Sequence, residues 1–288
     1  MTALRADRYR QINAHLFSCS DFELVELLDN GSSASVGIGG GSAVLYVDGV
    51  PVFAKRIPLT DLEIAHRGST ANLFDLPVFC QYGIGGPSFN AWRELAANKI
   101  VTDGVLAGET QSFPMLYHWR VLRGRSPIAD EHADINAVVA AQGNNPAVRG
   151  RLEALAAAQS SLVLFGEYIE HPLLDWLRRN PVGTADAVAE HLSEIVTFLA
   201  DRKLLHMDGH FDNMRSDGER IYLCDFGLAT SPTFDLSTAE RDFAERHAAH
   251  DADYAAMRLV NWLVTDVCGV PIPSSGGPLA SGFHRNSV

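Results

Sequence analysis

The chain has 288 residues, of which 47% are hydrophobic, so it holds enough apolar material for a sizeable core in one domain or two closely joined lobes. Its formal net charge of −12 argues against a primary role in binding nucleic acid, whose phosphates require a basic protein face. The same charge disfavours adhesion to anionic membrane surfaces.

The first third of the chain is expected to form mainly strands punctuated by glycine. The pattern predicts strands over 22–28, 43–47 and 50–57. Asp48-Gly49, between the last two strands, is a strong signal for a hairpin turn. The segment 30–42 holds five glycines and four serines and is expected to be a loop.

The middle of the chain is expected to contain one main helix. Segment 58–87 shows no regular pattern, but Ser88 after it can cap a helix over 89–103, where apolar side chains recur at helical spacing. Further strands are expected at 113–122 and 161–169. The alanine-rich stretch between these strands is expected to end in a short helix near 151–158.

The second half is expected to be mostly helical. Its clearest signal is an amphipathic stripe of Val188, Leu192, Ile195, Val196 and Leu199. The other expected elements are a short helix at 172–179, strands near 213–215 and 221–224 with a turn at Asp217-Gly218, a helix at 253–267, and a flexible tail from Pro271. A strand-rich part followed by a helix-rich part predicts an α+β architecture with two lobes.

The chemistry of the chain is concentrated in two short motifs. The stretch from Leu205 to Met214 contains the pattern H-x-D-x-H-x-x-N, and Asp225-Phe-Gly follows it. Phosphoryl transfer from ATP needs a carboxylate near the acceptor hydroxyl and hard oxygen ligands for Mg²⁺. Asp208 can supply the first, and Asn213 and Asp225 the second. The hairpin between the motifs should bring the three side chains together.

The two motifs resemble those of the protein-kinase-like superfamily, whose catalytic loop is H-R-D-x-x-x-x-N and whose metal motif is D-F-G. His210 replaces the lysine that is usual in Ser/Thr kinases, and this form of the loop is similar to aminoglycoside and choline phosphotransferases. The intact Asp225-Phe226-Gly227 is more typical of protein kinases. The resemblance implies a bilobal α+β fold, with a small antiparallel sheet and one main helix in the N-lobe and a mostly helical C-lobe.

The resemblance also implies roles for residues outside these motifs. Lys55, in Phe53-Ala-Lys55, corresponds to the lysine that contacts the α- and β-phosphates, and Glu94 is the candidate for its ion-pair partner. Because 39 residues separate the two, segment 58–87 would be an insertion ahead of the main helix, and 123–160 would be a second insertion.

Further nucleotide contacts follow from the same resemblance. The residues implied to cover the phosphates are Gly37, Gly39, Gly41 and Ser42, and those implied to meet adenine through their backbone are Glu167, Tyr168 and Ile169. His210 is included among the catalytic residues with Asp208, Lys55 and Asn213. Asp253 corresponds to the aspartate that braces the catalytic loop.

The implied organisation is an N-lobe over 1–167, a C-lobe over 168–270 and a flexible tail over 271–288. The chain departs from the family in two respects. Only 28 residues separate Asp225 from Asp253, without an A-P-E motif, and the helical region after Asp253 is short for a full protein-kinase C-lobe.

The function expected from the sequence is transfer of the ATP γ-phosphoryl group to a hydroxyl, with Mg²⁺ and ATP as cofactors. The acceptor is expected to be a Ser/Thr of a protein or peptide; a small molecule is the alternative, favoured by His210. A pseudokinase scaffold is the alternative from another class. The scattered cysteines and the charged start of the chain predict a cytoplasmic protein with no membrane partner.

Overall fold

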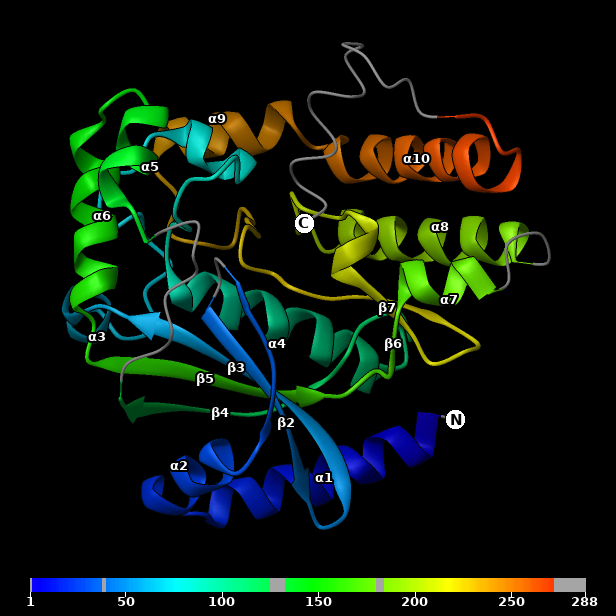
Figure 1. The fold of residues 1–288 in the computed structure, drawn as a ribbon, viewed down its shortest axis with the longest axis horizontal. Helices are drawn as coiled ribbons and strands as arrows, with labels where there is room; N and C mark the ends of the chain where they lie inside the picture. The colour runs from blue at the N-terminus through cyan, green and yellow to red at the C-terminus, as the bar shows by residue number, and fades with distance from the viewer. Residues whose placement is uncertain (1, 38–39, 125–132, 180–183, 272–288) are drawn as a thin grey trace.

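The protein is an α+β structure with antiparallel sheets, seen here in a computed structural model that describes residues 2–37, 40–124, 133–179 and 184–271 (Figure 1). The larger sheet has the strand order β1-β2-β3-β5-β4. Its strands are β1 (Ser32–Gly37), β2 (Gly40–Val47), β3 (Val50–Leu59), β4 (Leu116–Arg123) and β5 (Ser160–Glu167). The expected hairpin is confirmed: Asp48 and Gly49 have φ of 49° and 78°, the positive values that a tight two-residue turn requires.

Helices cover both faces of this sheet. Figure 1 shows α4 (Ala91–Ala107) on one face, and α1 (Thr2–Ser18) and α2 (Asp21–Asp29) on the other. Ile57 of β3 packs with Trp92 of α4. The larger core cluster joins residues of α1, such as Ile12, to residues of α4, such as Val101. The main helix expected at 89–103 is confirmed as α4, although Asn90 rather than Ser88 caps it.

The strand expected over 22–28 is wrong, because these residues form helix α2. Ser20 and Glu23 make a capping box in which each side chain bonds the backbone N–H of the other. This arrangement satisfies two N–H groups that a helix start leaves without partners. Helix α1 was not expected from the sequence.

Most of the loop expected over 30–42 is also strand. Residues 32–37 and 40–42 belong to β1 and β2, and Gly37 at the end of β1 pairs with Gly40 at the start of β2. Residues 38–39, including Gly39, lie outside the described residues. Gly40 has φ of 111°, and a Cβ there would lie 2.0 Å from the carbonyl oxygen of Arg56, so only glycine lets β2 approach β3 this closely.

The segments expected to be insertions pack against each other and against the start of α4. They contain α3 (Asp61–Ala65), η1 (Val78–Tyr82), α5 (Ile135–Ala141) and α6 (Pro146–Ala157). Glu63 joins them: its fully buried carboxylate accepts hydrogen bonds from the backbone of Thr60 and Ala91 and pairs with Arg151 at 2.9 Å. Segment 58–87 is therefore ordered around a buried ion pair.

The rest of the chain is mostly helical, as expected. Its elements are β6 (His171–Pro172), α7 (Leu173–Arg179), α8 (Ala185–Asp201), η3 (Phe211–Asn213), β7 (Met214–Ser216), β8 (Ile221–Leu223), α9 (Thr238–Arg246), α10 (His250–Trp262) and η4 (Leu263–Val267). β6, β7 and β8 form a small antiparallel sheet. The tail expected from Pro271 lies outside the described residues from 272 onward.

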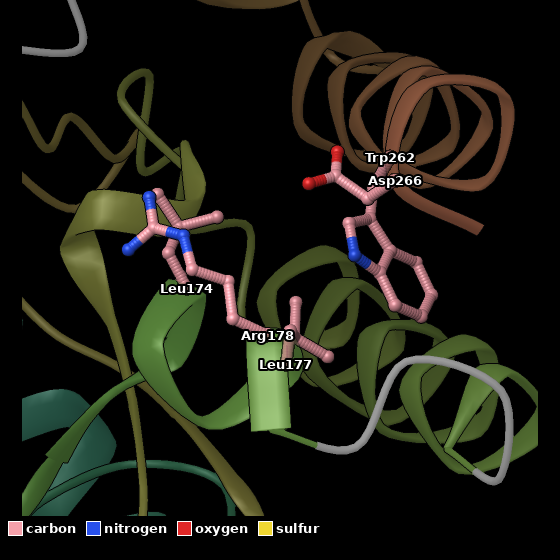
Figure 2. A pocket seen from close by; sticks show the side chains of 5 residues that line it. All are labelled: Leu174, Leu177, Arg178, Trp262 and Asp266. Atoms are coloured by element: carbon pink, nitrogen blue, oxygen red, sulfur yellow. The ribbon is translucent and has the colours of Figure 1, made fainter. Parts of the chain in front are cut away.

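Two further observations concern this part of the chain. A cavity of about 200 Å³ opens between α7 and the end of α10, lined by Leu174, Leu177, Arg178, Trp262 and Asp266 (Figure 2). Throughout the described ranges, none of the helices combines the length and the apolar character that crossing a bilayer demands.

Glu63→Gln should destabilise the protein by roughly 3–5 kcal/mol, because it leaves the buried Arg151 guanidinium without a counter-charge. Urea denaturation would measure the change. The matched control is Glu153→Gln, since Glu153 lies on α6 in an exposed pair with Arg149 and should contribute little. Equal midpoints for the two variants would contradict the role assigned to Glu63.

Candidate functional site

Lys55 of β3 lies between two carboxylates from distant parts of the chain. Its Nζ is 2.7 Å from Oε1 of Glu94 on α4 and 2.7 Å from Oδ1 of Asp225, which follows β8. The sequence separations are 39 and 170 residues. The structure thus brings together three of the residues that the sequence placed in one site.

The charges of Lys55, Glu94 and Asp225 shift one another's pKa values. Burial alone would lower the pKa of Lys55, but the two carboxylates outweigh it and hold that pKa above its ordinary value. Burial raises the pKa of Glu94 to about 7, although Lys55 opposes the rise. Asp225 is affected in the opposite direction: burial would raise its pKa, but Lys55 keeps it below the ordinary value. Lys55 therefore favours the ionised form of both carboxylates, and Asp225 is the one whose pKa falls below its ordinary value.

The predicted catalytic loop holds Asp208 and Asn213 against each other. The side-chain amide of Asn213 donates to the backbone oxygen of Asp208 and to its Oδ2, both at 2.9 Å. The backbone oxygen of Asn213 accepts a hydrogen bond from the N–H of Cys224 at 2.9 Å, which links the loop to the residue before Asp225. Burial raises the pKa of Asp208, and the nearby His210 and His206 oppose this rise. A carboxylate with a raised pKa is a better proton acceptor.

His206, the first histidine of the H-x-D-x-H-x-x-N pattern, has a structural position. It is fully buried, its Nδ1 accepts from the N–H of Asp208 and its Nε2 lies 2.8 Å from the carbonyl oxygen of Cys224. Its ring packs against Phe226 with 4.9 Å between centroids. The two motifs are thereby fixed to each other through one imidazole.

The backbone is strained at both motifs. Met207 and Asp225 have φ of 68° and 59°, left-handed values that are uncommon outside glycine. Such residues cost on the order of 1–3 kcal/mol each and tend to occur at functional sites. Their presence directly before Asp208 and at Asp225 is consistent with a site that requires particular side chains.

Asp251, not Asp253, braces the predicted catalytic loop. Oδ2 of Asp251 accepts the N–H of His206 at 2.6 Å and Oδ1 accepts the N–H of Met207 at 3.0 Å. Asp253 is exposed. The expectation failed by two residues because α10 begins at His250, earlier than predicted, and this start turns Asp251 toward the loop.

His210 lies between two acidic side chains of the loop, and its own side chain is 14% exposed. Its Nε2 is 3.5 Å from Asp208 Oδ1 and its Nδ1 is 3.5 Å from Asp212 Oδ2. A protonated His210 could therefore pair with either carboxylate. Burial raises the pKa of Tyr254 on α10, and the charges of Asp208 and Asp212 add to this rise.

The residues expected to contact the nucleotide lie in the larger sheet and just after it. Gly37 ends β1, Gly41 and Ser42 lie in β2, and Gly41 and Ser42 pair with Arg56 and Lys55 of β3. Glu167 ends β5, followed by Tyr168 and Ile169.

Within the segment 167–169, the N–H of Glu167 and the carbonyl oxygen of Ile169 already have hydrogen-bond partners. The Glu167 N–H donates to the carbonyl oxygen of Met115 at 2.8 Å, and the Ile169 carbonyl oxygen accepts from Arg215 Nε at 2.6 Å. Adenine would have to meet other backbone groups of this segment.

The donors at Asn213 and Asp225 suit magnesium. Lys55 and the N–H of Gly227 both bond to Oδ1 of Asp225, whose side chain is 44% exposed. The amide nitrogen of Asn213 is directed at Asp208, which leaves its carbonyl oxygen as a donor. Mg²⁺ commonly takes one or two carboxylates and completes its shell with phosphate oxygens and water. One carboxylate and one amide oxygen fit this pattern.

Comparison with known proteins adds no family assignment. No protein-family model matches the chain, and no curated protein matches it either.

Asp251→Asn should lower stability by about 2 kcal/mol or more, because two buried N–H groups lose a charged acceptor. Burial would raise the pKa of Asp251, but its hydrogen bonds and His206 hold that pKa below its ordinary value near 4. The contribution is therefore present at neutral pH and is lost as pH falls through the lowered native pKa. Urea denaturation between pH 7 and 3 should show the difference between wild type and variant shrinking below about pH 4.

Asp253→Asn is the control, since it lies on the same helix and is exposed. A larger effect from Asp253→Asn than from Asp251→Asn would overturn the assignment of the brace.

Proposed function

We propose that the protein is an ATP- and magnesium-dependent phosphotransferase that transfers the γ-phosphoryl group to a hydroxyl. The observation that carries the proposal is the position of Lys55, whose ammonium is held by Glu94 and Asp225 while the Asp208–Asn213 pair is attached to the same hairpin. A cation for phosphates, a carboxylate for the acceptor and oxygen donors for Mg²⁺ are the parts that this chemistry needs.

Each side chain has a role that follows from its environment. Asp208 orients the acceptor hydroxyl and takes its proton as the oxygen bonds to the γ-phosphorus; the bond from that phosphorus to the bridging oxygen breaks, and ADP leaves. The raised pKa of Asp208 favours the proton transfer. Lys55 positions the α- and β-phosphates. Asn213 and Asp225 hold Mg²⁺, which neutralises charge on the phosphates when bound. His210 adjoins Asp208 and is proposed to assist in orienting the acceptor. Catalysis would consist mainly of positioning and electrostatics.

The proposal extends to the architecture. The five-stranded sheet with α4 corresponds to a nucleotide-binding N-lobe over 1–167, and the helical part over 168–270 to a C-lobe, as in the bilobal protein-kinase-like fold. Gly37, Gly39, Gly41 and Ser42 would cover the phosphates at the β1–β2 turn. The segment 167–169 would receive adenine between the lobes.

The proposed acceptor is a Ser/Thr hydroxyl of a protein or peptide. A small-molecule acceptor is a second candidate because segment 58–87 covers the stretch that follows Asp225. Gln81 donates to the carbonyl oxygen of Leu228, and Tyr82 Oη lies 2.7 Å from His247 Nε2. A surface covered in this way has less room for an extended peptide.

A pseudokinase is disfavoured because the chain retains Lys55, Asp208, Asn213 and Asp225.

ATP with Mg²⁺ should raise the melting temperature, because binding to the native state adds about 2.7 kcal/mol when the ligand is at one hundred times its dissociation constant. Asp225→Asn should lose most of this shift, since it removes a charged metal ligand, whereas Asp242→Asn on the exposed face of α9 should keep it. Each variant is compared with itself without ligand in thermal denaturation. A wild type that shows no shift would contradict nucleotide binding.

Asp208→Asn should keep ATP–Mg²⁺ binding and lose turnover by roughly 10²–10⁴-fold, because an amide cannot accept the proton. Transfer of label from γ-labelled ATP to a panel of peptides, aminoglycosides and the protein itself would measure this. The panel also separates the two acceptor classes. Binding of ATP without transfer to any acceptor or to water, in wild type, would favour the pseudokinase.

A further inference from the structure

Arg5 of helix α1 reaches the end of β5 with a nearly buried guanidinium. Its Nε lies 3.1 Å from Glu167 Oε1 and its Nη2 lies 2.5 Å from Glu167 Oε2, which makes a two-pronged ion pair. Arg5 also donates to the side chain and backbone of Gln111 at 2.9 and 3.2 Å, and to the carbonyl oxygen of Phe113 at 2.8 Å. One side chain thus ties α1 to two distant stretches of the chain.

Glu167 depends on this contact. Its side chain is 5% exposed, and its Oε2 also accepts the N–H of Met115 at 3.3 Å. A buried carboxylate that loses its cation is costly, so removal of Arg5 would leave Glu167 either buried without a counter-charge or turned toward water. Either change alters the residue at which the proposed adenine segment begins.

Arg5 also touches the strand that leads to the proposed metal ligand. Its Cζ lies 5.4 Å from the ring centroid of Tyr222 on β8. The next residue, Leu223, donates its N–H to the carbonyl oxygen of Ser112 at 3.0 Å, within the stretch that Arg5 holds. The guanidinium of Arg5 therefore contacts both Glu167, at the start of the proposed adenine segment 167–169, and β8, the strand before Asp225.

We propose that Arg5 is a positioning residue for nucleotide binding, through which helix α1 sets the segment 167–169 and strand β8 in their binding arrangement. The inference rests on the proposed function, because it names what fixes that site. It assigns to α1 a role beyond covering the outer face of the sheet: the helix contributes to ATP affinity without touching ATP.

The test uses the full chain with Arg5→Met, which keeps much of the apolar length of the side chain and removes its charge. The dissociation constant for ATP–Mg²⁺ should rise by about tenfold, and the KM for ATP should rise with it while kcat changes little. In the ligand-free protein, hydrogen exchange should accelerate at the amides of Met115 and Glu167. Arg10→Met is the control, since Arg10 lies on the same helix in an exposed pair with Asp7.

Glu167→Gln tests the same link from the other side if Arg5→Met fails to fold. Gln can still accept the Met115 N–H, so the dissociation constant should rise in the same direction but less. Unchanged ATP affinity in the folded variant, or an equal loss in Arg10→Met, overturns the inference and leaves the proposed function intact. A wild type that binds no ATP overturns both.

Discussion

The structure depends on one buried ammonium. A charge removed from water is stable only when partners surround it closely. The partners of Lys55 are Glu94 on α4 and Asp225, which lies two residues beyond β8. Satisfying that single group requires β3, α4 and the segment that follows β8 to meet at one point. The remaining contacts of the site, including His206 between the two motifs and Asp251 beneath the loop, hold the hairpin where this meeting is possible.

Helix α4 is held by more than the ion pair that it supplies. Arg93, the neighbour of Glu94, is buried and donates to Glu240 of α9 at 2.6 Å and to the carbonyl oxygen of Thr70 at 2.6 Å. Glu63 holds the first N–H of the same helix. An outward swing of α4 would have to break these buried bonds together. Helix α4 is therefore expected to stay docked whether or not a nucleotide is bound.

The sequence could predict the features that local signals encode. Asp48-Gly49 forms a turn because both residues tolerate positive φ. The stripe from Val188 to Leu199 is recognised by its helical period alone. The spacing of Asp208, Asn213 and Asp225 follows from the loop and the hairpin between them. It could not predict features that depend on distant partners. Arg5 and Glu167 are 162 residues apart and carry no shared local pattern. The incorrect strand prediction over 22–28 could have been avoided from local sequence, because Ser20 and Glu23 form the capping box that marks a helix start. The shift from Asp253 to Asp251 followed from a helix start misplaced by about one turn.

The left-handed conformation of Asp225 has a consequence for large-scale mutagenesis. Glycine at this position would relieve strain of about 1–3 kcal/mol, and so would offset part of what the lost contact with Lys55 costs. A mutational scan that measures only the amount of folded protein would then rank Asp225→Gly as mild. The substitution nevertheless removes the carboxylate that the proposed chemistry requires. The effects of a substitution on the amount of folded protein and on its activity should differ most at residues with a strained backbone conformation.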